Sequence, residues 1–214
     1  MLKFYYGSGS PFAWRVWLAL EHKRIPHELV TISFSAREHK TPEYLAVNPR
    51  GKVPAIVDDG FCLYEAAVIV EYLDERSPGE PWLFPRELRA RAETRRLIKE
   101  ADEYLAPFQV RMARQLFFTK PENWDLDELA AMREKMLPEL VHYERVLSGD
   151  FLTGELSAAD FTVYPLLAVW RRFELRKPDV GLLSEAGPKV RAWMARIEAL
   201  PHFDNTYPPH WRQS

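Results

Sequence analysis

The feature that most restricts the fold of this chain is a change of hydrophobic pattern at a proline-rich segment, residues 78–85. Before this segment, short runs rich in β-branched and aromatic residues are separated by turn residues, which is typical of strands. After it, apolar residues recur every three or four positions and no strand pattern remains, which predicts helices. We therefore predict an α/β domain over residues 1–77, a linker over 78–85 and an all-α domain over 86–214.

The first domain is predicted to have the element order βαβαββα, which is the order of a thioredoxin-type domain. Ser10 is a favourable N-cap, and Pro11 is suited to the first position of the helix that follows. In the second domain, Ser157 and Asp160 form the pattern of a capping box in front of an apolar helix. The expected strands cover residues 2–6, 27–33, 53–57 and 61–63, and the expected helices cover residues 11–24, 41–48 and 65–77.

The charge balance and the single cysteine exclude several classes of function. The chain has 29 Lys plus Arg and 31 Asp plus Glu, so its formal net charge of -2 is not the basic footprint of a nucleic-acid-binding protein. Cys62 stands alone, which excludes an intramolecular disulfide and a cysteine-rich metal site. Neither an apolar signal peptide nor a membrane span is found. We therefore expect a cytoplasmic protein with no metal, no nucleic-acid partner and no membrane partner.

The loop before the first predicted helix lacks the chemistry of a thioredoxin. Where that fold carries Cys-x-x-Cys, this chain has Ser10-Pro11-Phe12-Ala13. Disulfide exchange needs a protein thiolate at this position, and none is present. The N-terminus of a helix favours an anion, because its first N–H groups are unpaired and its dipole is positive there. A hydroxyl in this place can therefore hold the thiolate of a bound molecule.

With these residues in view, the chain resembles the glutathione transferases over nearly its whole length. The resemblance is carried by residues 10–16, 48–55, 63–73 and 156–160. The first of these segments is similar to the serine-type members, the theta, zeta, phi and tau groups, in a bacterial or plant-like form. The resemblance implies a thioredoxin-like glutathione-binding domain and an all-α substrate-binding domain in a cytoplasmic homodimer. The implied activity is detoxification, in which glutathione as co-substrate is joined to a small hydrophobic electrophile without a further cofactor.

The resemblance assigns stabilisation of the glutathione thiolate to Ser10, which donates a hydrogen bond to the sulfur. Ser8, two residues earlier on a glycine-flanked loop, is the rival donor. Tyr5 and Tyr6 are expected to be strand residues.

The same resemblance places the tripeptide along a second segment. The backbone of Val53 is expected to pair with the cysteinyl part of glutathione, and the bond to Pro54 is expected to be cis. Lys52 is expected to contact the glycyl carboxylate, as is Lys40 or His39. For Lys40 and His39 the competing interpretation is a plain solvated loop.

Glu65 and the residue after it bind the γ-glutamyl ammonium and carboxylate in the family. The family has a serine at the second position, whereas this chain has Ala66, so only its backbone N–H remains to bind the carboxylate. Two alternatives to conjugation stay open. One is a glutathione-dependent peroxidase or isomerase that uses the same site. The other is a non-catalytic glutathione-transferase-like binding protein, for which the missing hydroxyl is the argument.

The electrophile pocket is expected to be apolar and to draw on both domains. Its candidate residues are Phe12, Tyr104, Phe108 and Met112, with Trp211 as a further one. Tyr104, Phe108 and Met112 also belong to a stripe at helical spacing that begins at Leu97, which predicts one long helix. The competing interpretation is that these side chains are helical core.

Overall fold

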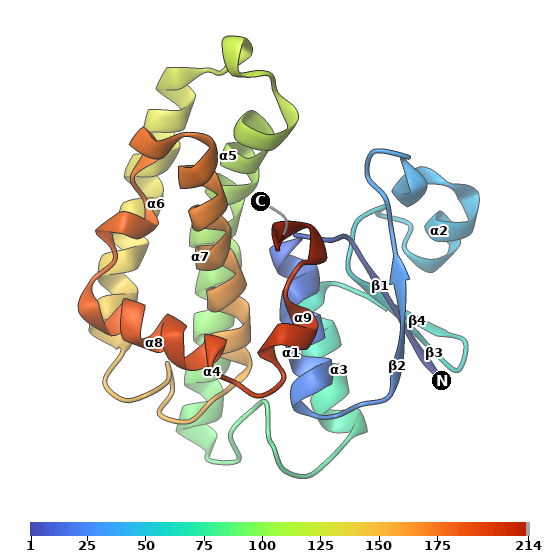
Figure 1. Ribbon diagram of the computed structural model, residues 1–214. Coiled ribbons are helices and arrows are strands. Elements are labelled where there is room, and N and C mark those ends of the chain that lie inside the picture. Colours follow the sequence, from blue (N-terminus) through green and yellow to red (C-terminus); the bar gives the residue numbers. More distant parts are fainter. Residues whose placement is uncertain (213–214) are drawn as a thin grey trace. The chain divides into compact units, whose positions relative to one another are not determined.

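The computed structural model describes residues 1–212 and divides into two compact units. The first unit is Met1–Arg86 together with the segment that begins at Leu200, and the second is Glu87–Ala199 (Figure 1). The domain boundaries expected from the sequence stay a prediction. The predicted boundaries place the segment after Leu200 in the helical domain. In the structure, aromatic side chains of this segment pack against the ring of Trp14 in the first unit.

The first unit has the predicted order βαβαββα around a mixed four-stranded sheet. The sheet order is β2-β1-β3-β4, with β1 parallel to β2 and antiparallel to β3, and with β3 antiparallel to β4. The strands are β1 (Leu2–Tyr6), β2 (His27–Thr31), β3 (Ala55–Asp58) and β4 (Phe61–Tyr64), and the helices are α1 (Pro11–His22), η1 (Glu38–Lys40), α2 (Pro42–Val47) and α3 (Ala66–Arg76). The expected thioredoxin-like fold is thereby confirmed.

The core of this unit lies between the sheet and α1 with α3. Leu2, Phe4 and Tyr6 alternate along β1 with their side chains buried, as expected for a strand with one face in the core. Helix α1 is buried over most of its length, and its Trp17 ring lies 6.4 Å from the Phe4 ring. Because α1 is buried, its N-terminus is held firmly in front of the loop that leaves β1.

The segment after α3 is anchored to the first unit by a buried ion pair. The Nζ of Lys23 lies 2.8 Å from Oδ1 of Asp74, and both side chains are almost fully buried. Lys23 also donates to the carbonyl of Pro81, and Asp74 accepts from the backbone N–H groups of Leu83 and Phe84. Burying two charges has a desolvation cost that the attraction between them alone does not offset. The additional hydrogen bonds to Lys23 and Asp74 offset it here.

The second unit is helical as predicted, apart from isolated bridges within residues 151–155. Its elements are α4 (Leu88–Glu100), η2 (Ala101–Leu105), α5 (Ala106–Phe118), η3 (Pro121–Asn123), α6 (Leu126–Val146), α7 (Ala158–Arg176), η4 (Pro178–Val180), η5 (Leu183–Glu185) and α8 (Pro188–Glu198). The remaining elements, α9 (Phe203–Thr206) and η6 (Pro209–Trp211), belong to the segment grouped with the first unit. No helix within residues 1–212 combines the length and the apolar character needed to cross a bilayer.

The predicted single long helix is interrupted by a π-helical turn, η2. Leu97 and Met112 are buried as the stripe requires, but the Tyr104 side chain inside the turn is 57% exposed. A π turn inserts a residue into the helix, so the side chains after it are rotated relative to those before it. The expectation that Tyr104 continues the buried stripe is therefore wrong.

The predicted capping box at the start of α7 is confirmed. The carboxylate of Asp160, which is fully buried, accepts four hydrogen bonds. Its Oδ1 accepts from the backbone N–H of Leu152 at 2.9 Å and from Nε1 of Trp193 at 2.8 Å. Its Oδ2 accepts from the N–H and the hydroxyl of Ser157 at 2.8 and 3.0 Å. Burial raises the pKa of Asp160, and these four donors oppose the rise.

The substitution Asp160→Ala is expected to lower the free energy of unfolding by about 3 kcal/mol or more, because it leaves several buried donors unpaired. Asp160→Asn keeps one acceptor oxygen and is expected to lose less. Guanidinium denaturation of the three proteins measures both changes. An alanine variant within about 1 kcal/mol of the wild type contradicts this account of α7.

Candidate functional site

Ser10 is the N-cap of α1, as predicted. Its backbone N–H donates to the carbonyl of Gly7 at 3.0 Å, and its Oγ accepts from the N–H of Ala13 at 3.3 Å. Because a hydroxyl accepts with a lone pair, capping leaves its proton available to a ligand. The hydroxyl makes no other hydrogen bond within residues 1–212, and Ser10 is only half-buried. The helix N-terminus thus presents one free O–H.

The hydroxyl of Ser8, unlike that of Ser10, already forms a hydrogen bond with a side chain of this protein. Its Oγ lies 2.7 Å from Nδ1 of His210. No local pattern in the sequence singles out His210, because Ser8 and His210 are 202 positions apart. Of the two candidate hydroxyls, the one on Ser10 is therefore the one that makes no hydrogen bond to another side chain within residues 1–212.

The bond between Val53 and Pro54 is cis, as the resemblance implies. A Cβ placed on Gly7 would lie 3.2 Å from Cγ2 of Val53, so this segment lies beside the start of the Gly7–Ser10 loop. Within residues 1–212, neither the N–H nor the C=O of Val53 has a hydrogen-bond partner. This stretch of backbone can therefore pair with an extended ligand.

The backbone just before Val53 is held by two side chains. The carbonyl of Lys52 accepts from the hydroxyl of Tyr44 at 2.6 Å and from Nδ2 of Asn48 at 2.7 Å. Burial raises the pKa of Tyr44 to about 12, so its hydroxyl stays protonated and remains a donor at neutral pH. The side chain of Lys52 is exposed and remains available to a ligand.

Lys40 lies close to the same segment. Gly51 has φ +57, and a Cβ at this position would lie 2.9 Å from Nζ of Lys40 and 2.8 Å from the carbonyl oxygen of His39. The His39 ring packs 5.0 Å from that of Phe34 and its Nδ1 is buried without a partner. Burial lowers the pKa of His39, and the positive charge of Lys40 lowers it further. Lys40 therefore contributes positive charge beside Gly51, and the lowered pKa disfavours the charged form of His39.

Glu65 and Ala66 lie where β4 passes into α3. Glu65 has φ 73, an uncommon backbone conformation for a residue other than glycine and one that clusters at functional sites. Its side chain is exposed and makes no capping hydrogen bond. The first N–H groups of α3, including that of Ala66, thus lack a side-chain cap, which leaves a place for a carboxylate.

The sheet brings these segments together. Tyr5 of β1 pairs with Ala55 of β3, and Ala55 pairs with Tyr64 of β4. Because β3 is antiparallel to both neighbours, the end of β1, the start of β3 and the end of β4 lie at one end of the sheet. The loop to Ser10 follows the end of β1, the Val53 segment precedes the start of β3, and Glu65 follows the end of β4. The predicted glutathione residues of the first unit are thereby neighbours.

The predicted electrophile residues are distributed over both units. Phe12 lies in the first turn of α1, half-buried, with the guanidinium of Arg15 5.7 Å from its ring centre. In the second unit, Tyr104 is exposed, Phe108 is half-buried and Met112 is fully buried. Met112 thus fits the competing interpretation as core, and the pocket stays a prediction. Trp211, the further candidate, is buried against Trp14 at 5.4 Å.

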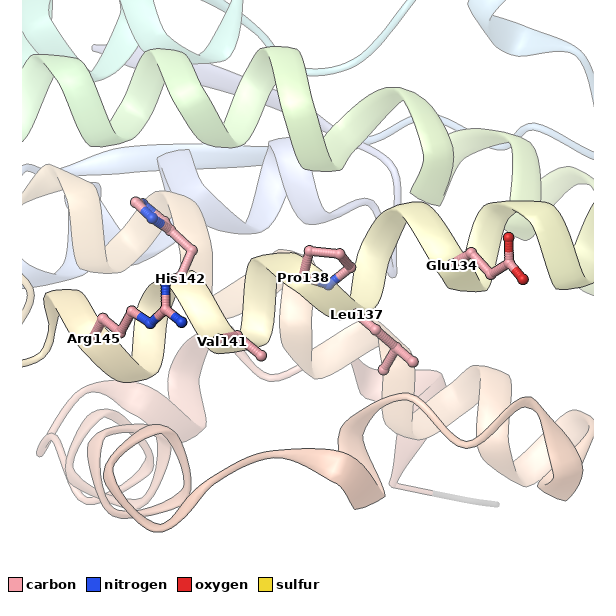
Figure 2. A pocket seen from close by; sticks show the side chains of 6 residues that line it. All are labelled: Glu134, Leu137, Pro138, Val141, His142 and Arg145. Carbon is pink, nitrogen blue, oxygen red and sulfur yellow. The ribbon is translucent and has the colours of Figure 1, made fainter.

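A separate hollow of about 620 Å³ lies along α6 in the second unit. Figure 2 shows its six lining side chains on this one helix, and none of them is a predicted site residue. They are Glu134, Leu137, Pro138, Val141, His142 and Arg145. His142 pairs with Glu100 at 3.2 Å. No group of three potential metal ligands occurs within the described residues 1–212.

Comparison with known proteins points to one family. Residues 9–76 match the family described as "Glutathione S-transferase, N-terminal domain", and residues 127–196 match "Glutathione S-transferase, C-terminal domain". The chain is 31% identical over 219 residues to "Glutathione S-transferase A" of Pleuronectes platessa, which covers 98% of this chain and 92% of that protein. It is 28% identical to "Probable maleylacetoacetate isomerase 2" of Drosophila melanogaster, over 78% of this chain and 73% of that one.

Among solved structures, the chain is similar to a glutathione S-transferase from the Antarctic clam Laternula elliptica. The sequence identity is 30% and the TM-score is 0.83, over 100% of this chain and 94% of that one. The similarity therefore extends over both units.

Proposed function

Because this chain belongs to the glutathione S-transferase family, we propose that it is a serine-type glutathione transferase that joins glutathione to hydrophobic electrophiles. The observation that carries this proposal is the Ser10 hydroxyl, which caps α1 and keeps its proton free. The neighbouring tyrosines are strand residues of β1. Tyr6 is buried with its ring stacked on that of Phe4, and the ring of Tyr5 packs against that of Tyr44.

The role of Ser10 is to stabilise the glutathione thiolate. A free cysteine thiol has a pKa of about 8.5, and lowering it by two units takes about 2.7 kcal/mol. A hydrogen bond to a charged group contributes about 1.5–3 kcal/mol, and a helix N-terminus adds about 0.3–1 kcal/mol. Together the hydroxyl and the dipole of α1 contribute about 1.8–4 kcal/mol, a range that includes the required value. The proton of the thiol passes to solvent, and the thiolate then attacks the electrophilic carbon, whose leaving group departs with the bonding electrons.

The remaining groups match the charges of glutathione. The unpaired backbone of Val53, next to cis-Pro54, takes the cysteinyl unit. Lys40 and Lys52 take the glycyl carboxylate. The γ-glutamyl carboxylate is bound by the N–H groups at the start of α3, which include that of Ala66. Glu65 binds the γ-glutamyl ammonium.

The resemblance further supports a cytoplasmic enzyme of detoxification that takes a hydrophobic electrophile. A second function, glutathione-dependent isomerisation, is favoured by the similarity to a protein named as a probable isomerase. An isomerase regenerates free glutathione, whereas a transferase consumes it. Measuring glutathione before and after turnover of a panel of electrophiles separates the two. Retention on immobilised glutathione without any turnover favours a binding protein instead.

Ser10→Ala is expected to reduce kcat/KM roughly 10- to 1,000-fold, because it removes a hydrogen bond to a charged group. It is also expected to raise the pH at which bound glutathione ionises. Steady-state kinetics with an aryl halide and a pH titration of thiolate absorbance measure these effects. Ser8→Ala is expected to have the smaller effect. The reverse order contradicts the choice of Ser10.

Glu65→Ala is expected to weaken glutathione binding strongly, because the ligand ammonium loses its counter-charge. Ala66→Ser is expected to strengthen it by at most about tenfold, because a single hydrogen bond is added. Titration calorimetry on the three proteins gives both values. Unchanged affinity in Glu65→Ala contradicts the proposed binding mode.

The resemblance also implies a homodimer. Sedimentation at micromolar concentration is expected to give twice the chain mass of 25.0 kDa. A species at the mass of one chain contradicts this part of the proposal.

A further inference from the structure

The C-terminal segment of the first unit is anchored on α1, close to Ser10. The indole Nε1 of Trp14 donates to Oγ1 of Thr206 at 2.9 Å, and Thr206 is fully buried. The Trp14 ring also lies 5.8 Å from that of Tyr207 and 5.4 Å from that of Trp211. The N–H of Trp14 donates to the carbonyl of Ser10 at 2.9 Å, so this anchor lies one helical turn from the N-cap. Residues after Thr206 are thereby brought to the loop in front of α1.

The far end of this segment touches the loop itself. Nδ1 of His210 lies 2.7 Å from Oγ of Ser8. Gly9 has φ +82, and a Cβ there would lie 2.9 Å from Cε1 of His210 and 3.3 Å from Nε1 of Trp211. A glycine is needed at this position both for the backbone conformation and for the close approach. His210 therefore covers Gly9 and bonds to the residue before it.

Ser10 lies at the end of this loop, and its backbone N–H donates to the carbonyl of Gly7 at 3.0 Å. The loop contains Gly7 and Gly9, which leave the backbone many conformations when nothing fixes them. The capping bond from Ala13 is long, 3.3 Å, so it fixes the hydroxyl less firmly than a short bond does. A donor stabilises developing or bound charge best when it is already oriented before the ligand arrives.

Building on the proposed function, we propose that His210 is a positioning residue for the thiolate site. By its hydrogen bond to Ser8 it holds the Ser8–Gly9 backbone, and through that backbone it orients the Ser10 hydroxyl. The same bond occupies the rival hydroxyl of Ser8. His210 does not touch the sulfur in this account, and its whole effect passes through the loop.

The test compares His210→Ala with His210→Asn and His210→Gln in the full-length protein. The asparagine amide has its polar atoms near the place of Nδ1, and the glutamine amide has them near the place of Nε2. The alanine variant is expected to reduce kcat/KM by about 3- to 10-fold, the value of one hydrogen bond, and asparagine but not glutamine is expected to restore it. The pH at which bound glutathione ionises is expected to rise in the alanine variant by about half a unit.

Two further measurements separate positioning from simple support of the fold. Asn205→Ala is the matched control, because it removes an exposed bond between the same segment and Glu21 of α1, 3.0 Å long, away from the loop. It is expected to leave the ionisation of glutathione unchanged. The losses from Ser8→Ala and His210→Ala are expected to be non-additive, because each removes the same bond.

Hydrogen exchange of the peptide that contains Gly9 gives an outcome independent of activity. Faster exchange in His210→Ala than in Asn205→Ala is expected. Unchanged exchange, or faster exchange with unchanged glutathione ionisation, overturns the positioning role. A wild-type protein that never ionises bound glutathione overturns the proposed function and the positioning role with it. That result differs from a failure of the positioning role alone, because it is obtained with the wild-type protein before any variant is made.

Discussion

The antiparallel pairing of β3 with both β1 and β4 is the constraint on which the candidate site depends. Through the pairs of Ala55 with Tyr5 and Tyr64, three connections that are separate in the sequence meet at one end of the sheet. One of them carries Ser10, the next carries Val53, and the last carries Glu65. A shift of this register by one residue reverses the faces of the strand and separates these groups. The candidate site therefore depends on the register of the sheet more than on any single side chain.

The charges at that end of the sheet suit a ligand with charge at both ends. Lys40 and Lys52 lie beside the Gly51 turn, while Glu65 and the uncapped start of α3 lie beyond the sheet ends. The side chains of Lys40, Lys52 and Glu65 are exposed, so placing their charges there costs little desolvation. Glu65 has φ 73, a backbone conformation that is uncommon for a residue other than glycine and that is found most often at functional sites.

Contacts distant in sequence then stabilise the local geometry. The Lys23–Asp74 pair anchors the segment that leaves the first unit, and Trp14 anchors the segment that returns to it. The returning segment ends at His210, against the loop that carries Ser10. The loop is thus bounded on one side by Val53 and Phe34 and on the other by His210 and Trp211. Small residues at Gly7 and Gly9 allow this close packing.

The sequence by itself determined the features that depend on neighbours along the chain. The Ser10 cap with Pro11, the Ser157–Asp160 capping box and the order βαβαββα are local, because their hydrogen bonds and periodicities span a few residues. Tertiary structure alone decided the rest. The π turn that exposes Tyr104 depends on how helices pack, which a stripe of apolar residues does not record. The bond between Ser8 and His210 joins residues 202 positions apart, and no pattern along a chain encodes a pairing that only folding brings within 2.7 Å.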